Sequence, residues 1–349
     1  MFRRATHVVA SALARDGWTR AAGAAGAGLI LADQMPSVST RLRSVSSSLP
    51  SARWMSSSSS SSSSSDEGTT ATTAGTTASF GFRDVDAREK EHLVRGVFEQ
   101  VAPSYDLMND LMSAGVHRAW KDYLVSKVGV FPGMTHLDVA GGTGDVAFRV
   151  LRALRAAEAS ARKRGSGGFE PGRVIVSDIN PFMLGEGVKR ARKLGFLREE
   201  SGASHGAVDA EMAQLSFVEG NAECLPFEDA SVDVYTIAFG LRNVTDTLAA
   251  LKDAHRLLKP GGRFMCLEFS HVKHEPLRSL YEAYSFNIIP AMGAAVANDW
   301  ASYQYLVESI RRFPKQDELE NMMREAGFKS VSHENITGGV VAIHSGFKL

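Results

Sequence analysis

The stretch HLDVAGGTGD, residues 136–145, sets the architecture of this 349-residue chain. Its first five residues are typical of a short buried strand, and residues 146–154 continue it with the apolar spacing of a helix. Glycines let a backbone approach a ligand closely, and a helix N-terminus presents free N–H groups to an anion. Gly142, Gly144 and Ala147 match the G-x-G-x-x-A fingerprint of dinucleotide-binding folds, although a tight turn without a ligand would use the same glycines.

Strand-like segments recur on both sides of this loop, separated by helix-length segments. Such alternation predicts an α/β fold, a doubly wound and mostly parallel sheet with helices on both faces. Segments 328–336 and 340–349 flank Thr337-Gly338-Gly339 and predict a hairpin that adds an antiparallel strand at the C-terminus. Residues 155–172 and 199–214 interrupt the alternation and are predicted to be surface insertions. The strand-like segments are 136–140, 174–176, 215–218, 232–239 and 263–269.

The N-terminal residues 1–65 differ from the rest of the chain in charge and composition. They hold seven Arg, no Lys and only two Asp, and they end in ten consecutive serines, Ser56 to Ser65. Arg-rich, Ser-rich and acid-poor composition is typical of a mitochondrial transit peptide, and a disordered tail without an address is the alternative. Residues 66–79 have the composition of a disordered linker, and residues 80–349 are predicted to form one enzyme domain.

Composition excludes several classes of function. The 39 Lys and Arg balance 39 Asp and Glu, which excludes a strongly basic, nucleic-acid-binding protein. Without the leader, 32 basic and 37 acidic residues remain, so the body is mildly acidic. Cys224 and Cys266 lie in apolar runs, so we expect neither a disulfide framework nor a Cys-based zinc site. We expect no other metal site either. The apolar run 288–297 is too short to span a bilayer.

Polar residues that follow the next two predicted strands are candidates for contacts with a nucleoside. Asp178 ends the second strand, where a carboxylate can accept both hydroxyls of a ribose, although it could equally cap the helix that starts at Pro181. Asn221 and Ala222 follow the third strand, at the edge where doubly wound sheets bind their ligands. Asn221 and the backbone at Ala222 are therefore predicted to contact an adenine ring.

With longer motifs in residues 80–349, these features resemble a class I methyltransferase that uses S-adenosylmethionine, and more narrowly the ubiquinone/menaquinone biosynthesis C-methyltransferase family. The motifs are residues 105–113 with His117 and Trp120, residues 239–243, and residues 256–262 with 267–270. The resemblance implies a Rossmann-like sheet of seven strands. Ala238 departs from the pattern, because bacterial relatives often have Ser there, so we expect no hydroxyl contact to the cofactor from it. The cofactor-binding residues that the resemblance implies are Gly141, Gly142, Thr143, Gly144, Asp178, Asn221 and Ala222.

The resemblance also implies a reaction, the methylation of a ring carbon of a 2-methoxy-6-polyprenyl-1,4-benzoquinol in ubiquinone biosynthesis. A phenol has a pKa of about 10, so the site must favour the phenolate, which is the better nucleophile. We assign Arg242 to stabilise the phenolate and to orient a water that takes up the proton, and Asn243 to hydrogen-bond the ring oxygen. Tyr105 and His117 complete the candidate catalytic set. The alternatives are a structural salt bridge for Arg242 and a packed core position for His117.

The implied partners are the polyprenylated benzoquinol, a multi-subunit ubiquinone-biosynthesis complex, a second copy of the chain in a homodimer, and the membrane surface. The segment 281–297 suits a channel for the polyprenyl tail, a membrane contact, a contact with a partner or an ordinary core helix. The implied location is the matrix side of the mitochondrial inner membrane. Three other functions stay open: a demethylmenaquinol or demethylphylloquinol methyltransferase, a nicotinamide-dependent oxidoreductase, and a non-catalytic cofactor-binding subunit.

Overall fold

The computed structural model of the chain describes residues 77–101, 105–197 and 212–349, and no side chain from 100 to 107. The predicted leader, most of the predicted linker and the segment 198–211 lie outside the described residues. The first strand begins at Thr77, just before the predicted start of the enzyme domain.

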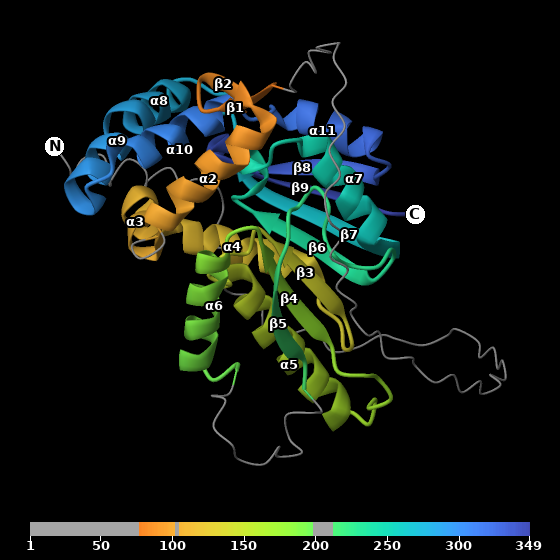
Figure 1. The fold of residues 1–349 in the computed structure, drawn as a ribbon. Coiled ribbons are helices and arrows are strands. Elements are labelled where there is room, and N and C mark those ends of the chain that lie inside the picture. The colour runs from red at the N-terminus through yellow and green to blue at the C-terminus, as the bar shows by residue number, and fades with distance from the viewer. Residues whose placement is uncertain (1–76, 102–104, 198–211) are drawn as a thin grey trace, which may run out of the picture. The chain divides into compact units, whose positions relative to one another are not determined.

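A seven-stranded sheet organises the described residues (Figure 1), with the strand order β5-β4-β3-β6-β7-β9-β8. Strands β3 to β7 pair in parallel, whereas β9 pairs antiparallel with both β7 and β8. The predicted doubly wound sheet with an antiparallel C-terminal strand is therefore confirmed. The strand order changes direction beside β3, and ligands of such sheets bind at this switch point. The strands are β3 (Thr135–Val139), β4 (Arg173–Asp178), β5 (Gln214–Glu219), β6 (Val232–Ala238), β7 (Leu258–Phe269), β8 (Lys329–Ile336) and β9 (Val341–Phe347).

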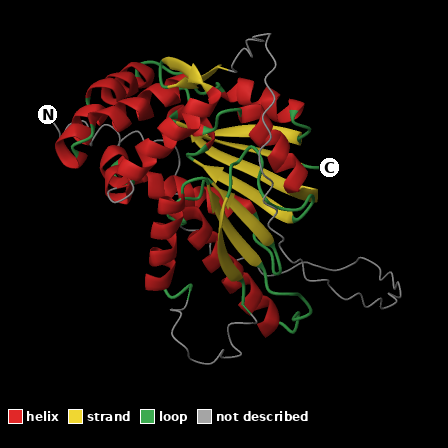
Figure 2. Ribbon diagram, in the orientation of Figure 1, coloured by secondary structure: helices red, strands yellow, loops and turns green. Residues whose placement is uncertain are grey.

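Helices cover both faces of the sheet (Figure 2). Because successive strand residues point to opposite faces, Leu137 and Val139 of β3 pack in one buried cluster with helices α7 and α11. Val174 and Val176 of β4 pack in a second cluster with α4, α5 and α6 on the other face. These helices are α4 (Val116–Val128), α5 (Asp145–Lys163), α6 (Pro181–Lys193), α7 (Thr247–Leu257) and α11 (Gln316–Glu325).

Helix α5 is longer than predicted, since it continues through the first half of the segment 155–172 that we expected to be a surface insertion. The carboxylate of Glu158, within that segment, is fully buried and accepts hydrogen bonds from the backbone N–H groups of Gly172 and Ala213 at 2.7 and 2.9 Å. The Ala- and Arg-rich composition reflects helix propensity rather than a loop. Only the glycine-rich second half forms the predicted connection.

A second group of elements lies at the carboxyl ends of the central strands, at the upper left of Figure 1. Tyr305 of α10 donates a hydrogen bond to Asn243, which belongs to the short helix η3 (Leu241–Asn243) directly after β6, and this contact joins the group to the sheet. None of the described helices is long and apolar enough to span a membrane. The elements are β1 (Thr77–Phe80), β2 (Arg83–Asp86), α2 (Ala87–Val101), α3 (Tyr105–Ser113), α8 (Leu277–Asn287), α9 (Ile289–Met292), the π-helical turn η4 (Gly293–Ala297) and α10 (Trp300–Arg312).

Candidate functional site

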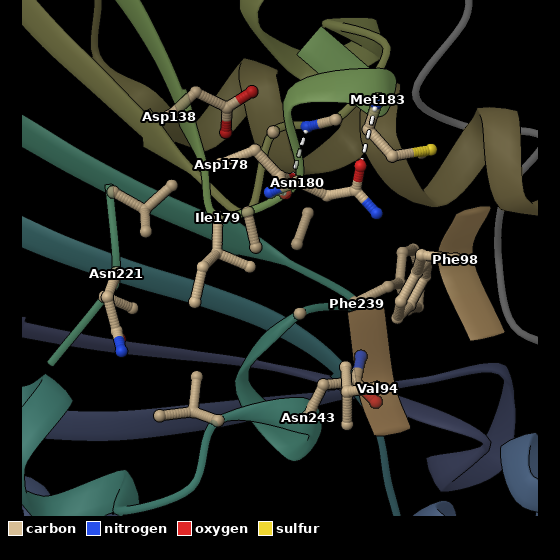
Figure 3. A pocket seen from close by; sticks show the side chains of 18 of the residues that line it. Val94, Phe98, Asp138, Asp178, Ile179, Asn180, Met183, Asn221, Phe239 and Asn243 are labelled. Carbon is tan, nitrogen blue, oxygen red and sulfur yellow. Dashed lines mark hydrogen bonds between the residues drawn. The ribbon is translucent and has the colours of Figure 1, made fainter. Parts of the chain in front are cut away.

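The carboxyl ends of β3, β4, β5 and β6 open into one pocket, which residues of α2 and Lys121 of α4 also line. Figure 3 shows Val94 and Phe98 of α2 beside it. Six of the seven predicted cofactor-binding residues line it, and Gly144 lies in the same loop behind them. Of the predicted catalytic residues, Asn243 lines the pocket. The sheet therefore brings together residues that lie far apart in the sequence. The lining side chains and backbone include Val94, Arg95, Phe98, Lys121, Asp138, Gly141, Gly142, Thr143, Asp178, Asn180, Met183, Asn221, Ala222, Phe239 and Asn243.

The glycine loop fits a ligand that runs along its backbone. Gly142 adopts the left-handed conformation, with φ of 49°, and its N–H donates to Oδ2 of Asp178 at 2.9 Å. A Cβ at Gly142 would lie 3.0 Å from Cε of Met183, inside the pocket. Any other residue would therefore carry backbone strain and crowd Met183, which also lines the pocket. This cradle fits the adenosyl part of S-adenosylmethionine.

Asp178 lies at the end of β4, as predicted, and points its carboxylate into the pocket (Figure 3). Oδ1 accepts from the N–H of Asn180 at 2.9 Å. Burial raises the pKa of Asp178 to about 6, although the backbone N–H groups of Asn180 and Gly142 oppose the shift. The alternative role as a helix cap is wrong, because Asn180 is the N-cap of α6 and accepts from the N–H groups of Phe182 and Met183. Asp178 thus keeps its acceptor capacity for a ligand.

The turn after β5 closes the pocket beside Asp178. Oδ1 of Asn221 accepts from the N–H of Glu223 at 2.9 Å, which holds the turn, and Ala222 is 8% exposed. Glu223 accepts from the backbone N–H groups of Thr245 and Asp246 at 2.9 and 3.1 Å. It ties this turn to the loop after η3, so two walls of the pocket are linked.

Asp138 lines the pocket from β3, and the sequence reasoning did not assign it a role. Its Oδ2 accepts from the N–H of Ala147 at 3.0 Å, and its Oδ1 accepts from the hydroxyl of Thr236 at 2.7 Å. Burial raises the pKa of Asp138 to about 7, and these two hydrogen bonds partly oppose the rise. The sequence does contain a signal for Asp138 as a pocket residue, because this acid lies in the strand directly before the glycine loop.

Lys121 and Asp145 form a second charged group at the pocket that the sequence reasoning missed. Nζ of Lys121 lies 2.9 Å from Oδ2 of Asp145, and their side chains are 8% and 13% exposed. Burial alone would raise the pKa of Asp145, yet Lys121 and Arg149 hold it well below its usual range. No local pattern predicts this pair, because the two residues are 24 positions apart and on different helices.

Phe239 follows β6 with φ of 58°, an uncommon conformation for an aromatic residue. Its N–H donates to the carbonyl of Leu267 at 2.8 Å, and its carbonyl accepts from Nη1 of Arg242. Its ring lies 4.9 Å from that of Phe269 and 6.3 Å from that of Trp120. Strain of this kind is held by surrounding contacts and is concentrated at functional sites. Here it presents an aromatic ring to the pocket.

Arg242 and Asn243 belong to η3, which follows Phe239, and their side chains contact different residues. Oδ1 of Asn243 accepts from the hydroxyl of Tyr305 at 3.1 Å, and Asn243 lines the pocket. Arg242 is not among the lining residues; its Nη1 lies 2.8 Å from Oε1 of Glu268. Nε of Arg242 is buried and has no hydrogen-bond partner among the described residues. One donor of the guanidinium is therefore left for a ligand or a water.

The other two candidate catalytic residues belong to α3 and α4. Nε2 of His117 lies 2.8 Å from Oδ1 of Asp110, and His117 does not line the pocket. Burial lowers the pKa of His117, which favours the neutral imidazole, while the hydrogen bond with Asp110 opposes the shift. Tyr105 is the first residue of α3, and its side chain lies outside the described residues.

Comparison with known proteins places this site in a family. A protein of Oryza sativa subsp. japonica is 53% identical over 272 residues, which cover 78% of this chain and 88% of the relative. A Drosophila melanogaster relative is 52% identical over 273 residues, with 78% and 85% covered, and a Homo sapiens relative is 48% identical over 289 residues, with 77% and 84% covered. All three are named 2-methoxy-6-polyprenyl-1,4-benzoquinol methylase, mitochondrial.

The family model extends over nearly the whole described domain. It matches residues 84–348, which include the glycine loop, Asp178, Asn221 and the segment from Phe239 to Asn243. The resemblance first noticed in the motifs is thereby confirmed, and the chain belongs to the ubiE/COQ5 methyltransferase family.

Proposed function

We propose that this chain transfers the methyl group of S-adenosylmethionine to a ring carbon of 2-methoxy-6-polyprenyl-1,4-benzoquinol in ubiquinone biosynthesis. The observation that carries the proposal is the shared pocket. The glycine loop, Asp178 and Asn221 form one side of it, while Phe239 and Asn243 form the other. A nucleoside on the first side and an aromatic ring on the second would meet within one enclosed space, as methyl transfer requires.

The cofactor, when bound, supplies an electrophilic methyl group on a sulfonium. The carboxylate of Asp178 would accept the ribose hydroxyls, and Asn221 and the backbone at Ala222 would contact the adenine. Gly141 to Gly144 would follow the cofactor closely, since no side chain stands in the way at Gly142. These residues would bind and orient the cofactor in the pocket that Phe239 and Asn243 also line.

The ring carbon gains a methyl group and loses its hydrogen as a proton, so the site must raise the electron density of the ring. Asn243 would hydrogen-bond a ring oxygen, in the orientation that Tyr305 gives it. Arg242, one residue away, would stabilise the phenolate by its charge and orient a water that accepts the proton. Tyr105 and His117 are proposed to assist from α3 and α4, where the lowered pKa of His117 favours the neutral imidazole that a base requires.

A methyl-transfer assay tests this function. The purified chain is incubated with isotope-labelled S-adenosylmethionine and a short-chain 2-methoxy-6-prenyl-1,4-benzoquinol under reducing conditions, and the product is analysed by mass spectrometry. We expect one labelled methyl group on a ring carbon, and none when the quinone form replaces the quinol and the reductant is left out. Transfer only to a naphthoquinol would favour the demethylmenaquinol or demethylphylloquinol methyltransferase.

Two further alternatives have distinct signatures. Binding of S-adenosylhomocysteine without any methyl transfer would identify a non-catalytic subunit, and binding of NADH in place of S-adenosylhomocysteine would identify an oxidoreductase. Family membership favours the methyltransferase over both.

The composition of residues 1–65 supports a location in the cell. We propose that residues 1–65 are a mitochondrial transit peptide and that the enzyme works on the matrix side of the inner membrane, as part of a multi-subunit complex or as a homodimer. The Arg-rich composition and the relatives' mitochondrial names support this location. A fluorescent fusion of residues 1–79 should enter mitochondria; plastid targeting would instead favour a phylloquinone-type substrate.

A further inference from the structure

Lys121 is a buried cation that lines the pocket, and the proposed reaction gives it no role. It lies in α4, its side chain is 8% exposed, and its Nζ lies 2.9 Å from Oδ2 of Asp145. Within the described part of the chain this is its one hydrogen bond. An ammonium group has three donors, and two of them are left for a ligand in the pocket.

Asp145 does not need Lys121 as its counter-ion. Its Oδ1 also receives hydrogen bonds from Arg149, one helical turn away, and from Nη2 of Arg190 at 3.1 Å. Lys121 thus shares this carboxylate with two arginines, of which Arg149 also pairs with Asp122 at 2.6 Å. A buried ammonium that is only partly paired is unfavourable unless a further anionic group completes its surroundings.

The position of Lys121 identifies the part of the cofactor that would supply this anion. In the proposed function, Asp178 and Asn221 hold the adenosine at one side of the glycine loop. Lys121 reaches the pocket from α4, beside Asp145 at the end of that loop, and its Nζ lies 6.0 Å from the centre of the Phe239 ring. The remaining end of S-adenosylmethionine is an amino acid with an α-carboxylate.

We infer that Lys121 binds the α-carboxylate of the methionine moiety of S-adenosylmethionine. The inference rests on the proposed function, since it requires that cofactor. Arg95 is the other cation among the lining residues, but its side chain is 41% exposed and is paired with Glu99 at 3.0 Å. Lys121 is therefore the cation that is both buried and incompletely paired.

Calorimetric titration with two ligands tests the inference. S-adenosylhomocysteine carries the α-carboxylate, whereas decarboxylated S-adenosylhomocysteine keeps the ammonium and lacks it. Each ligand is titrated into the full chain, Lys121→Met and a matched control, Lys127→Met. Lys127 lies in the same helix, its side chain is 42% exposed, and it pairs with Glu334 away from the pocket.

Lys121→Met should bind S-adenosylhomocysteine at least about 10-fold more weakly, as expected for the loss of a charge-assisted hydrogen bond. It should bind the decarboxylated ligand as the wild type does, and Lys127→Met should match the wild type for both. An equal loss for the two ligands would overturn the inference and leave Lys121 as a structural partner of Asp145. No loss for either ligand would overturn it as well.

The wild type provides an independent check if Lys121→Met does not fold. It should prefer S-adenosylhomocysteine over the decarboxylated ligand, and equal affinities would overturn the inference without any variant. Lys121→Gln, which removes the charge but keeps a polar end, should lose that preference. If the wild type bound neither ligand, the proposed cofactor itself would be contradicted, which is a different result from a variant that fails to discriminate.

Discussion

Arg242 and Glu268 form a buried ion pair, with 2.8 Å between Nη1 and Oε1 and with side chains that are 6% and 1% exposed. The pair holds η3 against β7, because Nη1 of Arg242 also donates to the carbonyl of Phe239 and the N–H of Arg242 reaches Oε2 of Glu268 at 3.4 Å. Arg242 therefore stabilises this part of the fold, and the proposed function gives it a second role in the reaction. A single substitution of Arg242 would change both the stability of the fold and the turnover, so it cannot separate the two roles.

Replacing the ion pair separates these roles. Arg242→Ala leaves Glu268 buried and unpaired, which should lower the free energy of unfolding by about 3–5 kcal/mol and turnover by about 100-fold or more. Arg242→Met combined with Glu268→Gln removes both charges and keeps an acceptor for the N–H of Phe269. This double variant should regain stability, measured by urea unfolding, without regaining turnover, and both variants should keep their affinity for S-adenosylhomocysteine. Recovery of turnover together with stability would show that Arg242 acts only through the fold.

Tyr305 orients Asn243 through a hydrogen bond that should affect turnover rather than cofactor binding. Tyr305→Phe removes the hydroxyl that donates to Oδ1 of Asn243, and the loss of one neutral hydrogen bond corresponds to about a 3- to 10-fold fall in kcat. Asn243→Ala should cause a larger fall, because it removes the proposed contact with the ring oxygen. In the double variant the effect of Tyr305→Phe should disappear. Additive effects in that double-mutant cycle would refute the coupling.

The affinity for S-adenosylhomocysteine should depend on pH through Asp178. Burial raises the pKa of this carboxyl to about 6, so the carboxylate that we propose as acceptor of the ribose hydroxyls is present above pH 7 and is lost as the pH falls through 6. Calorimetry at several values from pH 5 to 8 should show constant affinity at the upper end and weaker binding below pH 6. Asp178→Asn should bind more weakly at pH 8 and show a flatter profile. A wild-type profile that is flat across this range would contradict the role of the carboxylate.

Local patterns predicted the parts of the site that follow directly from strand ends. A glycine loop after an apolar strand, and an acid at the end of the next strand, are readable without a structure because the topology of a parallel sheet puts both at one edge. Asp178 and Asn221 were found in this way. The predicted length of α5 was wrong. The glycines near residue 165 favoured an insertion over the whole segment 155–172, although its first half contains strong helix formers.

Other parts of the site have no local signal. Val94 and Phe98 reach the pocket from α2, about one helical turn apart and far before the glycine loop in the sequence. Their contact with the pocket depends on how α2 packs over the sheet, which the spacing of apolar residues does not specify. Lys121 is hidden for the same reason, as its partner is on another helix. Interactions between separate elements thus decide which residues complete the site.

The helices α8 to α10 expose apolar side chains that should contact a lipid surface. Phe286 and Ile288 are 41% and 36% exposed, whereas Ile289 is 6% exposed and belongs to a buried cluster with Tyr303. Phe286→Ser combined with Ile288→Ser should reduce co-flotation with vesicles that contain cardiolipin and leave the melting temperature nearly unchanged. Ile289→Ser should lower the melting temperature instead, which makes it the control for a core position. Undiminished flotation of the exposed double variant would exclude these side chains from membrane contact.

The stability of the fold should depend on pH through Asp138. Its pKa is raised to about 7 in the fold because the carboxyl is buried, against 3.8 for an ordinary aspartate. The folded state therefore favours the protonated form, and the stability that this form provides is complete below pH 4 and is lost as the pH rises through 7. A shift of one pKa unit corresponds to about 1.4 kcal/mol, which sets an upper limit of about 4 kcal/mol for this loss.

Asp138→Asn should remove this dependence, because an amide does not ionise. Its oxygen can accept from the N–H of Ala147, and its nitrogen can donate to the hydroxyl of Thr236, which can turn towards Nε2 of His136 at 2.9 Å. The free energy of unfolding of the variant, minus that of the wild type, should increase between pH 4 and pH 7 in urea titrations. Parallel curves for the two proteins across that range would mean that Asp138 stays ionised in the fold, and that the Thr236 and Ala147 hydrogen bonds outweigh its burial.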